Sequence, residues 1–153
     1  MMKLKIKKAT VTDKEILWSL SKRTFIDTYY HLNEPEHIDA YIDAHFNPIQ
    51  VEKGLADQSN IFYMAWLNQK AVGYFKLRWK TPAALDDYKV LEIERIYVDK
   101  AFQGQKIGKA LMQQAIKVAE EFACDYVWLG VWNENAKALA FYKKQGFETF
   151  GTQ

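Results

Sequence analysis

Residues 90 to 122 pass from an apolar strand through a short loop with glycine into a long amphipathic helix. Apolar residues fill much of Val90 to Val98, as in a strand of a sheet core. A helix is predicted over Gln105 to Phe122, because apolar residues recur there along one helical face. These positions are Ile107, Leu111, Ala115, Val118 and Phe122. A strand that leads into a helix in this way is typical of mixed α/β domains.

The remaining elements complete a domain of the α/β (α+β) class. Strands are predicted at 4–7, 61–67, 71–79, 126–131 and 147–150, with 61–67 and 71–79 forming a hairpin. Helices are predicted after the Thr12 to Glu15 capping box, after Pro35, over Gln50 to Ala56, and over Asn135 to Gln145, where Gly146 ends the helix. The 153 residues show no repeat or linker, so one domain is expected over 1–153.

The buried faces of the first two helices follow from helical spacing. The residues expected there are Ile16, Leu17, Leu20 and Thr24 in the first helix, and Ile38, Tyr41 and Ile42 in the second. Cys124, the only cysteine, excludes an intrachain disulfide framework and is expected to be a small buried residue.

The composition excludes several classes of protein. The 21 basic and 19 acidic residues leave a net charge of +2, without the concentrated basic excess of a nucleic-acid-binding protein. No long apolar run follows the start, so we expect no signal peptide, no membrane span and a cytoplasmic location. The histidines lack a partner set at metal-ligand spacing, so no metal site is predicted.

The loop before the long helix has the features of an anion site. A helix start presents unpaired backbone N–H groups and a partial positive charge, and Gly104 and Gly108 allow close approach of a ligand. Lys106 and Lys109 oppose the helix dipole unless a phosphate lies nearby. Alternatively, the glycines only shape a turn. No triphosphate P-loop or dinucleotide fingerprint is present, so neither nucleotide site is expected.

Two motifs in this half of the chain resemble those of the GNAT acetyltransferase superfamily. Gln103-x-x-x-x-Gly108 is similar to the family pattern Gln/Arg-x-x-Gly-x-Gly/Ala, and Asn135-x-x-Ala138-x-x-x-Tyr142-x-x-x-Gly146-Phe147 is similar to the second signature. The resemblance implies a splayed mixed sheet flanked by helices. The resemblance also implies one more strand after Phe150, and the given sequence stops at Gln153 without it. The sequence is cut, the strand is absent, or a partner chain replaces it, and an exposed edge there would favour a possible homodimer.

One position departs from the pattern. The family's first glycine is Lys106 here. We expect Lys106 to adopt ordinary helical φ and ψ and to add a positive charge beside the pyrophosphate, with Gly104 supplying the flexibility.

Three runs resemble the PaiA-type spermidine/spermine N-acetyltransferases within the superfamily. They are Thr24–Tyr29, Leu91–Val98 and Val127–Trp132. The resemblance implies acetyl-CoA as cosubstrate and a polyamine or another small-molecule amine as acceptor. The alternatives are a protein N-terminus or lysine as acceptor, and a non-catalytic CoA-binding module.

The resemblance also implies roles for individual residues. Backbone groups of Ile96, Tyr97 and Val98 would bind the pantetheine arm, and Asn135 would contact its end. Tyr142 would lie near the sulfur and protonate the thiolate. Amides of the loop would bind the pyrophosphate, and this loop comprises Gln103, Gly104, Gln105, Lys106, Ile107, Gly108 and Lys109.

Glu92 and Glu94 are the candidates for the base. They lie two apart on one strand and therefore share a face unless a bulge intervenes. Alternatively, they form a solvated face or pair with Arg95 or Lys89. The resemblance to GNAT enzymes favours Glu92, acting through water, because some of them carry their base at this position, eleven residues before Gln103. A cationic acceptor would be attracted by acids that are otherwise ordinary surface charges, namely Asp27, Glu34, Glu36, Asp86 and Asp87.

Overall fold

The computed structural model describes residues 3–30, 34–131 and 135–151. The strands are β1 (Leu4–Lys8), β2 (Asn60–Leu67), β3 (Lys70–Arg78), β4 (Val90–Val98) and β5 (Tyr126–Trp128). The α-helices are α1 (Lys14–Tyr29), α2 (Pro35–His45), α3 (Pro48–Ala56), α4 (Ile107–Glu121) and α5 (Ala136–Lys144). Short 3-10 turns are η1 (Val11–Asp13), η3 (Ala83–Leu85) and η4 (Lys100–Phe102).

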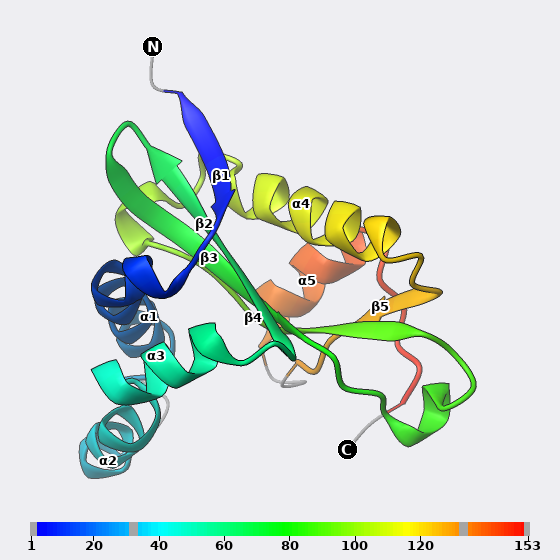
Figure 1. Cartoon of the computed structure of the whole chain (residues 1–153), viewed down its shortest axis with the longest axis horizontal. Helices are drawn as coiled ribbons and strands as arrows, with labels where there is room; N and C mark the ends of the chain where they lie inside the picture. Colours follow the sequence, from blue (N-terminus) through cyan, green and yellow to red (C-terminus); the bar gives the residue numbers. More distant parts are fainter. Residues whose placement is uncertain (1–2, 31–33, 132–134, 152–153) are drawn as a thin grey trace.

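The strands form one mixed sheet in the order β1-β2-β3-β4-β5 (Figure 1). Neighbours from β1 to β4 are antiparallel, whereas β5 runs parallel to β4. The β4–β5 pairing extends only from Val90 to Glu92, which face Tyr126 to Trp128. Because β5 ends at Trp128, no described strand pairs with this side of β4 beyond Glu92, and the sheet is splayed there. The predicted fold class is confirmed.

Helices cover both faces of this sheet. Figure 1 shows α1 and α3 on one side and α4 and α5 on the other. Leu17 and Leu20 of α1 pack with Met64 and Tyr74 on the first face. The larger core lies beneath α4, whose residues Ile107, Leu111, Met112, Ala115, Val118 and Ala119 are buried. None of the described helices has the length and apolar character that crossing a bilayer requires.

Two sequence predictions fail at helix ends. The capping box is formed by Thr10 and Asp13 around η1 and not by Thr12 and Glu15, so α1 begins after a 3-10 turn. Ile16 and Phe122, predicted to be buried, are 44% and 45% exposed. Ile16 lies in the first turn of α1 and Phe122 is the C-cap of α4. Helical periodicity alone does not determine burial at the ends of a helix.

Smaller differences concern α2 and the residue after α4. Ile38 and Ile42 are buried as predicted, but Tyr41 is 44% exposed and stacks on Phe25 with ring centroids 5.0 Å apart. Cys124 is half-buried against the larger core, and burial raises the pKa of its thiol.

The predicted C-terminal strand at 147–150 is wrong. These residues have no regular secondary structure, and Phe150 is 51% exposed. The strand predicted over 126–131 ends at Trp128. A strand needs a partner for its backbone groups, and the described part of the chain places no strand beside 147–150. Residue 132 of the run Val127–Trp132 lies outside the described residues.

Candidate functional site

The outer edge of β4 is open beyond Glu92. Asp99 N donates to Val72 O at 2.7 Å, so the backbone of Asp99 faces β3. Backbone groups of successive residues alternate between the two sides of a strand. Ile96 and Val98 therefore present their N–H and C=O groups to the open side, whereas those of Tyr97 face β3. The predicted pantetheine set is divided, with two members at the open edge.

The loop after β4 turns sharply into α4. Gly104 has φ 88°, and Lys106, at the N-cap of α4, has φ 63° and ψ 19°. Lys106 is therefore in the left-handed region, and the expectation of ordinary helical φ and ψ is wrong. The chain must reverse direction between the loop and the helix axis, and this conformation accomplishes the turn. A residue with a β-carbon is disfavoured there by about 1–2 kcal/mol, which explains why the family pattern has glycine.

The start of α4 presents backbone donors. The first bond of the helix joins Ala110 N to Lys106 O at 3.1 Å, so the amides of Ile107, Gly108 and Lys109 precede the helical ladder. The Lys106 side chain makes no capping hydrogen bond to these amides. The Ile107 side chain is buried in the core, so only its backbone faces the loop. The arrangement suits an anion such as a pyrophosphate.

Gln103 connects this loop to two other elements. Its Nε2 donates to Val98 O at 3.4 Å, and its Oε1 accepts from Lys137 Nζ at 3.5 Å. Lys137 lies in the first turn of α5 and was missed in the sequence analysis. The available signal was a lysine opposing a helix dipole, as for Lys106 and Lys109. The three lysines bring positive charge to the same loop.

Tyr142 lies on α5 and packs between two other rings. Its ring centroid is 5.4 Å from that of Phe141 and 5.9 Å from that of Phe147. Burial, with a smaller contribution from Tyr29, raises the pKa of Tyr142 to about 12. Gly146, at φ 96°, ends α5 as predicted, and Phe147 N donates to Tyr142 O at 3.1 Å.

Asn135 and Tyr97 have structural partners that the sequence did not indicate. Asn135 is the N-cap of α5, and its Oδ1 accepts from Ala138 N at 3.1 Å. The hydroxyls of Tyr97 and Tyr29 are 3.1 Å apart. Burial, followed by the neighbouring Tyr29, raises the pKa of Tyr97.

Glu92 and Glu94 share one face of β4, although the β3–β4 register shifts between Lys76 and Leu77. Arg78 Nε donates to Glu92 Oε1, and Arg78 Nη1 lies 3.1 Å from Glu94 Oε1. Lys76 Nζ lies 2.5 Å from Glu94 Oε2. The ion-pair partners are thus on β3, across the sheet, rather than Arg95 or Lys89.

The environments of the two carboxylates differ. Burial acts to raise the pKa of Glu94, but Lys76, Arg95 and Arg78 outweigh it and hold this pKa below its ordinary value. Glu92 is buried at 6% exposure, and among the described residues its one cationic contact is Arg78. A base needs a free lone pair, and Glu94 has both oxygens beside cations.

The acids predicted to attract an acceptor do not form one group. Asp27 is on α1, and Glu34 and Glu36 lie at the start of α2. Asp86 and Asp87 follow η3, which Figure 1 shows on the opposite side of the molecule from α2. The five acids are therefore divided between the α1 and α2 helices and the turn η3.

The sequence profile of the Acetyltransferase (GNAT) family matches residues 17–147. The chain belongs to this family. The match covers both motifs from which the resemblance was inferred, and the predicted enzyme class, an N-acetyltransferase, is confirmed. An uncharacterized N-acetyltransferase of Lactobacillus delbrueckii subsp. lactis is 31% identical over 148 residues, which are 95% of this chain and 86% of the relative.

Further similarities are with a spermidine acetyltransferase, a PaiA N-acetyltransferase and an aminoglycoside acetyltransferase. A spermidine N(1)-acetyltransferase of Thermoplasma acidophilum is 24% identical over 155 residues, 99% of this chain and 92% of the relative. The crystal structure of the PaiA N-acetyltransferase from Thermoplasma acidophilum, in complex with coenzyme A, has a TM-score of 0.86 at 22% identity and covers 99% and 94% of the two chains. The aminoglycoside N-acetyltransferase AAC(6')-Iy, also with CoA, has a TM-score of 0.76 at 16% identity, with coverage of 100% and 93%.

Proposed function

We propose that this acetyltransferase transfers the acetyl group of acetyl-CoA to a primary amine, with a polyamine such as spermidine or spermine as acceptor. The observation that carries the proposal is the open edge of β4 beside the uncapped start of α4. An extended chain with amide groups fits the open edge of β4, and a pyrophosphate fits the start of α4. These two groups are joined in CoA.

The chain's own groups divide the binding of acetyl-CoA among them. Ile96 and Val98 would bond the pantetheine amides as an added strand does. The amides of Ile107, Gly108 and Lys109 would bind the pyrophosphate. Gly104, Gln105 and Lys106 would form the outer turn of this cradle, and Gln103 would hold it against β4. The Oδ1 atom of Asn135 caps α5, and its Nδ2 would donate to the end of the pantetheine arm.

Tyr142 is the proposed general acid. A pKa of about 12 keeps its hydroxyl protonated at neutral pH, as a proton donor requires. When the amine attacks the thioester carbonyl and the carbon–sulfur bond breaks, the Tyr142 hydroxyl would protonate the departing sulfur. Its packing between Phe141 and Phe147 holds the ring in place for this transfer.

Glu92 is the proposed base, acting through water. A primary amine with a lysine-like pKa is neutral in only about one of a few thousand molecules at pH 7. Proton removal must therefore accompany attack. Glu94 is the less suitable candidate, because Lys76 and Arg78 lower its pKa. Among the described residues Glu92 has Arg78 as its one cationic partner, and this contact is made by Oε1.

The polyamine acceptor is supported by the spermidine acetyltransferase relative and by the acids near the end of α1. Asp27 and Glu36 are exposed there, and Glu34 precedes α2. A polyamine carries several ammonium groups, so one can react while another pairs with these carboxylates. Such pairing gives specificity and faster association more than raw affinity.

Thiol release from acetyl-CoA tests the function. The purified protein is incubated with spermidine, spermine, an aminoglycoside, or peptides with a free N-terminus or lysine, and acetylated products are identified by mass. We expect the fastest release with the polyamines. Faster acetylation of a peptide or aminoglycoside would contradict the polyamine proposal. Tight CoA binding without release for any acceptor would favour a non-catalytic CoA-binding module.

A further inference from the structure

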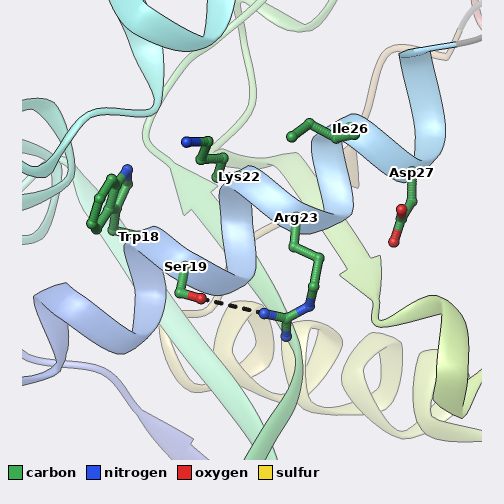
Figure 2. Close-up of a pocket in the computed structure, with 6 residues that line it drawn as sticks. All are labelled: Trp18, Ser19, Lys22, Arg23, Ile26 and Asp27. Carbon is green, nitrogen blue, oxygen red and sulfur yellow. Dashed lines mark hydrogen bonds between the residues drawn. The ribbon is translucent and has the colours of Figure 1, made fainter.

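An ion pair joins α1 to the beginning of the loop that connects β4 to α4. Arg23 Nε donates to Asp99 Oδ2 at 3.2 Å, and Arg23 Nη2 lies 3.0 Å from the same oxygen. The remaining nitrogen, Arg23 Nη1, donates to Ser19 Oγ at 3.3 Å, and Figure 2 shows this hydrogen bond. The two partners are 76 residues apart in the sequence.

Asp99 occupies the point at which β4 becomes the loop. Its backbone N–H bonds Val72 O on β3, and its Oδ1 accepts from Ala101 N at 3.1 Å, which caps η4. The turn η4 leads directly to Gln103. The remaining oxygen, Oδ2, is the one that Arg23 contacts. Asp99 therefore connects the sheet, the loop and α1 through three separate groups.

Because Asp99 is buried, its carboxylate needs a partner. Asp99 is only 6% exposed, and a buried carboxylate without a partner is strongly disfavoured. Arg23 supplies that partner from the rim of an open groove along α1, lined also by Trp18, Ser19, Lys22, Ile26 and Asp27 (Figure 2). The donors of Arg23 face Asp99 and Ser19, so this arginine is directed at the loop's anchor rather than toward a ligand.

We propose that Arg23 and Asp99 are positioning residues that fix the loop 103–109 relative to β4, so that its amides meet the pyrophosphate while Ile96 and Val98 meet the pantetheine. This inference rests on the proposed binding of acetyl-CoA. The pair acts on one half of the ligand, because Asp99 anchors the loop and the open edge of β4 depends on β3 instead.

Binding of CoA and of pantetheine, measured by calorimetry without an acceptor, tests the proposal. Pantetheine lacks the pyrophosphate. For R23Q and D99N we expect CoA affinity to fall by about tenfold, the lower range for residues that orient a ligand-binding group, with pantetheine affinity unchanged. A general structural defect would weaken both ligands. R23K keeps the charge and is expected to lie between R23Q and the unsubstituted protein.

The opposite charges of the two residues provide a second discrimination. R23Q removes a positive charge and D99N removes a negative one, so long-range electrostatics alone would shift the affinity for anionic CoA in opposite directions. Positioning predicts a loss in both. Lys22→Gln is the matched control, since Lys22 is exposed on the same helix and has no ion-pair partner among the described residues. Its CoA affinity is expected to stay within about twofold.

Several results would overturn the inference. These are opposite shifts for R23Q and D99N, equal losses for CoA and pantetheine, or a K22Q effect as large as that of R23Q. If R23Q or D99N fails to fold, R23K against K22Q decides, because R23K retains the charge and equal affinities for the two would refute positioning. Unsubstituted protein that binds no CoA would refute the proposed function as well, whereas normal binding with unaffected variants refutes only the positioning role.

Discussion

Replacing Lys106 by glycine and, separately, by alanine tests the structure of the loop 103–109. Lys106 has φ 63° at the N-cap of α4. Both variants lack the lysine charge and stem, and they differ only in the β-carbon. Any difference between them therefore reports the cost of holding a β-carbon in the left-handed region, reduced by the greater freedom of glycine in the unfolded chain.

The magnitude follows from two opposing contributions. The left-handed conformation disfavours a residue with a β-carbon by about 1–2 kcal/mol, and the greater freedom of glycine in the unfolded chain offsets about 0.5–1 kcal/mol. K106G should therefore unfold with a free energy about 1 kcal/mol greater than K106A. In a chain of this size this corresponds to about 2–4 °C in Tm.

Urea denaturation and thermal melting measure this difference, and calorimetry with CoA measures its functional consequence. If the β-carbon crowds the pyrophosphate, K106G also binds CoA more tightly than K106A. If the lysine charge contributes, both variants bind more weakly than the unsubstituted protein, by up to about fivefold for an exposed charge. Equal stability of the two variants, or greater stability of K106A, would refute a left-handed residue at this position.

Three other substitutions test neighbouring parts of the site. Tyr142→Phe should lower kcat about 10²-fold with little change in KM, and an unchanged kcat in this variant would exclude Tyr142 as the acid. In the unsubstituted enzyme, kcat should show no loss from Tyr142 ionisation up to pH 10, because the pKa of Tyr142 is about 12. Gly108→Ala should stabilise the protein by about 0.5–1 kcal/mol in urea denaturation, because alanine has the higher helix propensity. The added β-carbon would fit, since it would lie 3.6 Å from Phe141 Cζ and 3.8 Å from Val98 Cγ2, both ordinary contacts. A loss of stability would contradict this packing. The folded pKa of Glu94 lies below its ordinary value of 4.5, so its ionised form stabilises the fold above that pH, and this contribution is lost as the pH falls through the folded pKa. Glu94→Gln should therefore flatten the acid side of the stability curve, and identical acid limbs for the two proteins would show that the ion pairs contribute nothing.

The sequence alone was sufficient where the signal is local. The bounds of β4 were predicted as observed, and the ends of α4 and α5 within two residues. The apolar periodicity lies inside each segment, and Gly146 directly follows the end of α5. The two signatures also lie in short segments, which is why the family was recognisable without coordinates. At position 106 the family's glycine itself indicated a left-handed turn, and the lysine there concealed it.

Only the tertiary structure decided which groups meet across the sheet and between helices. The contact of Arg23 with Asp99 spans 76 residues, and that of Lys137 with Gln103 spans 34. Pairing of β4 with β3 determined that Arg78 contacts both Glu92 and Glu94. Such contacts depend on strand register and on how helices dock, and these arise from the packing of the whole core. The sequence therefore predicted the loop between β4 and α4, and the fold determined which residues hold that loop in place.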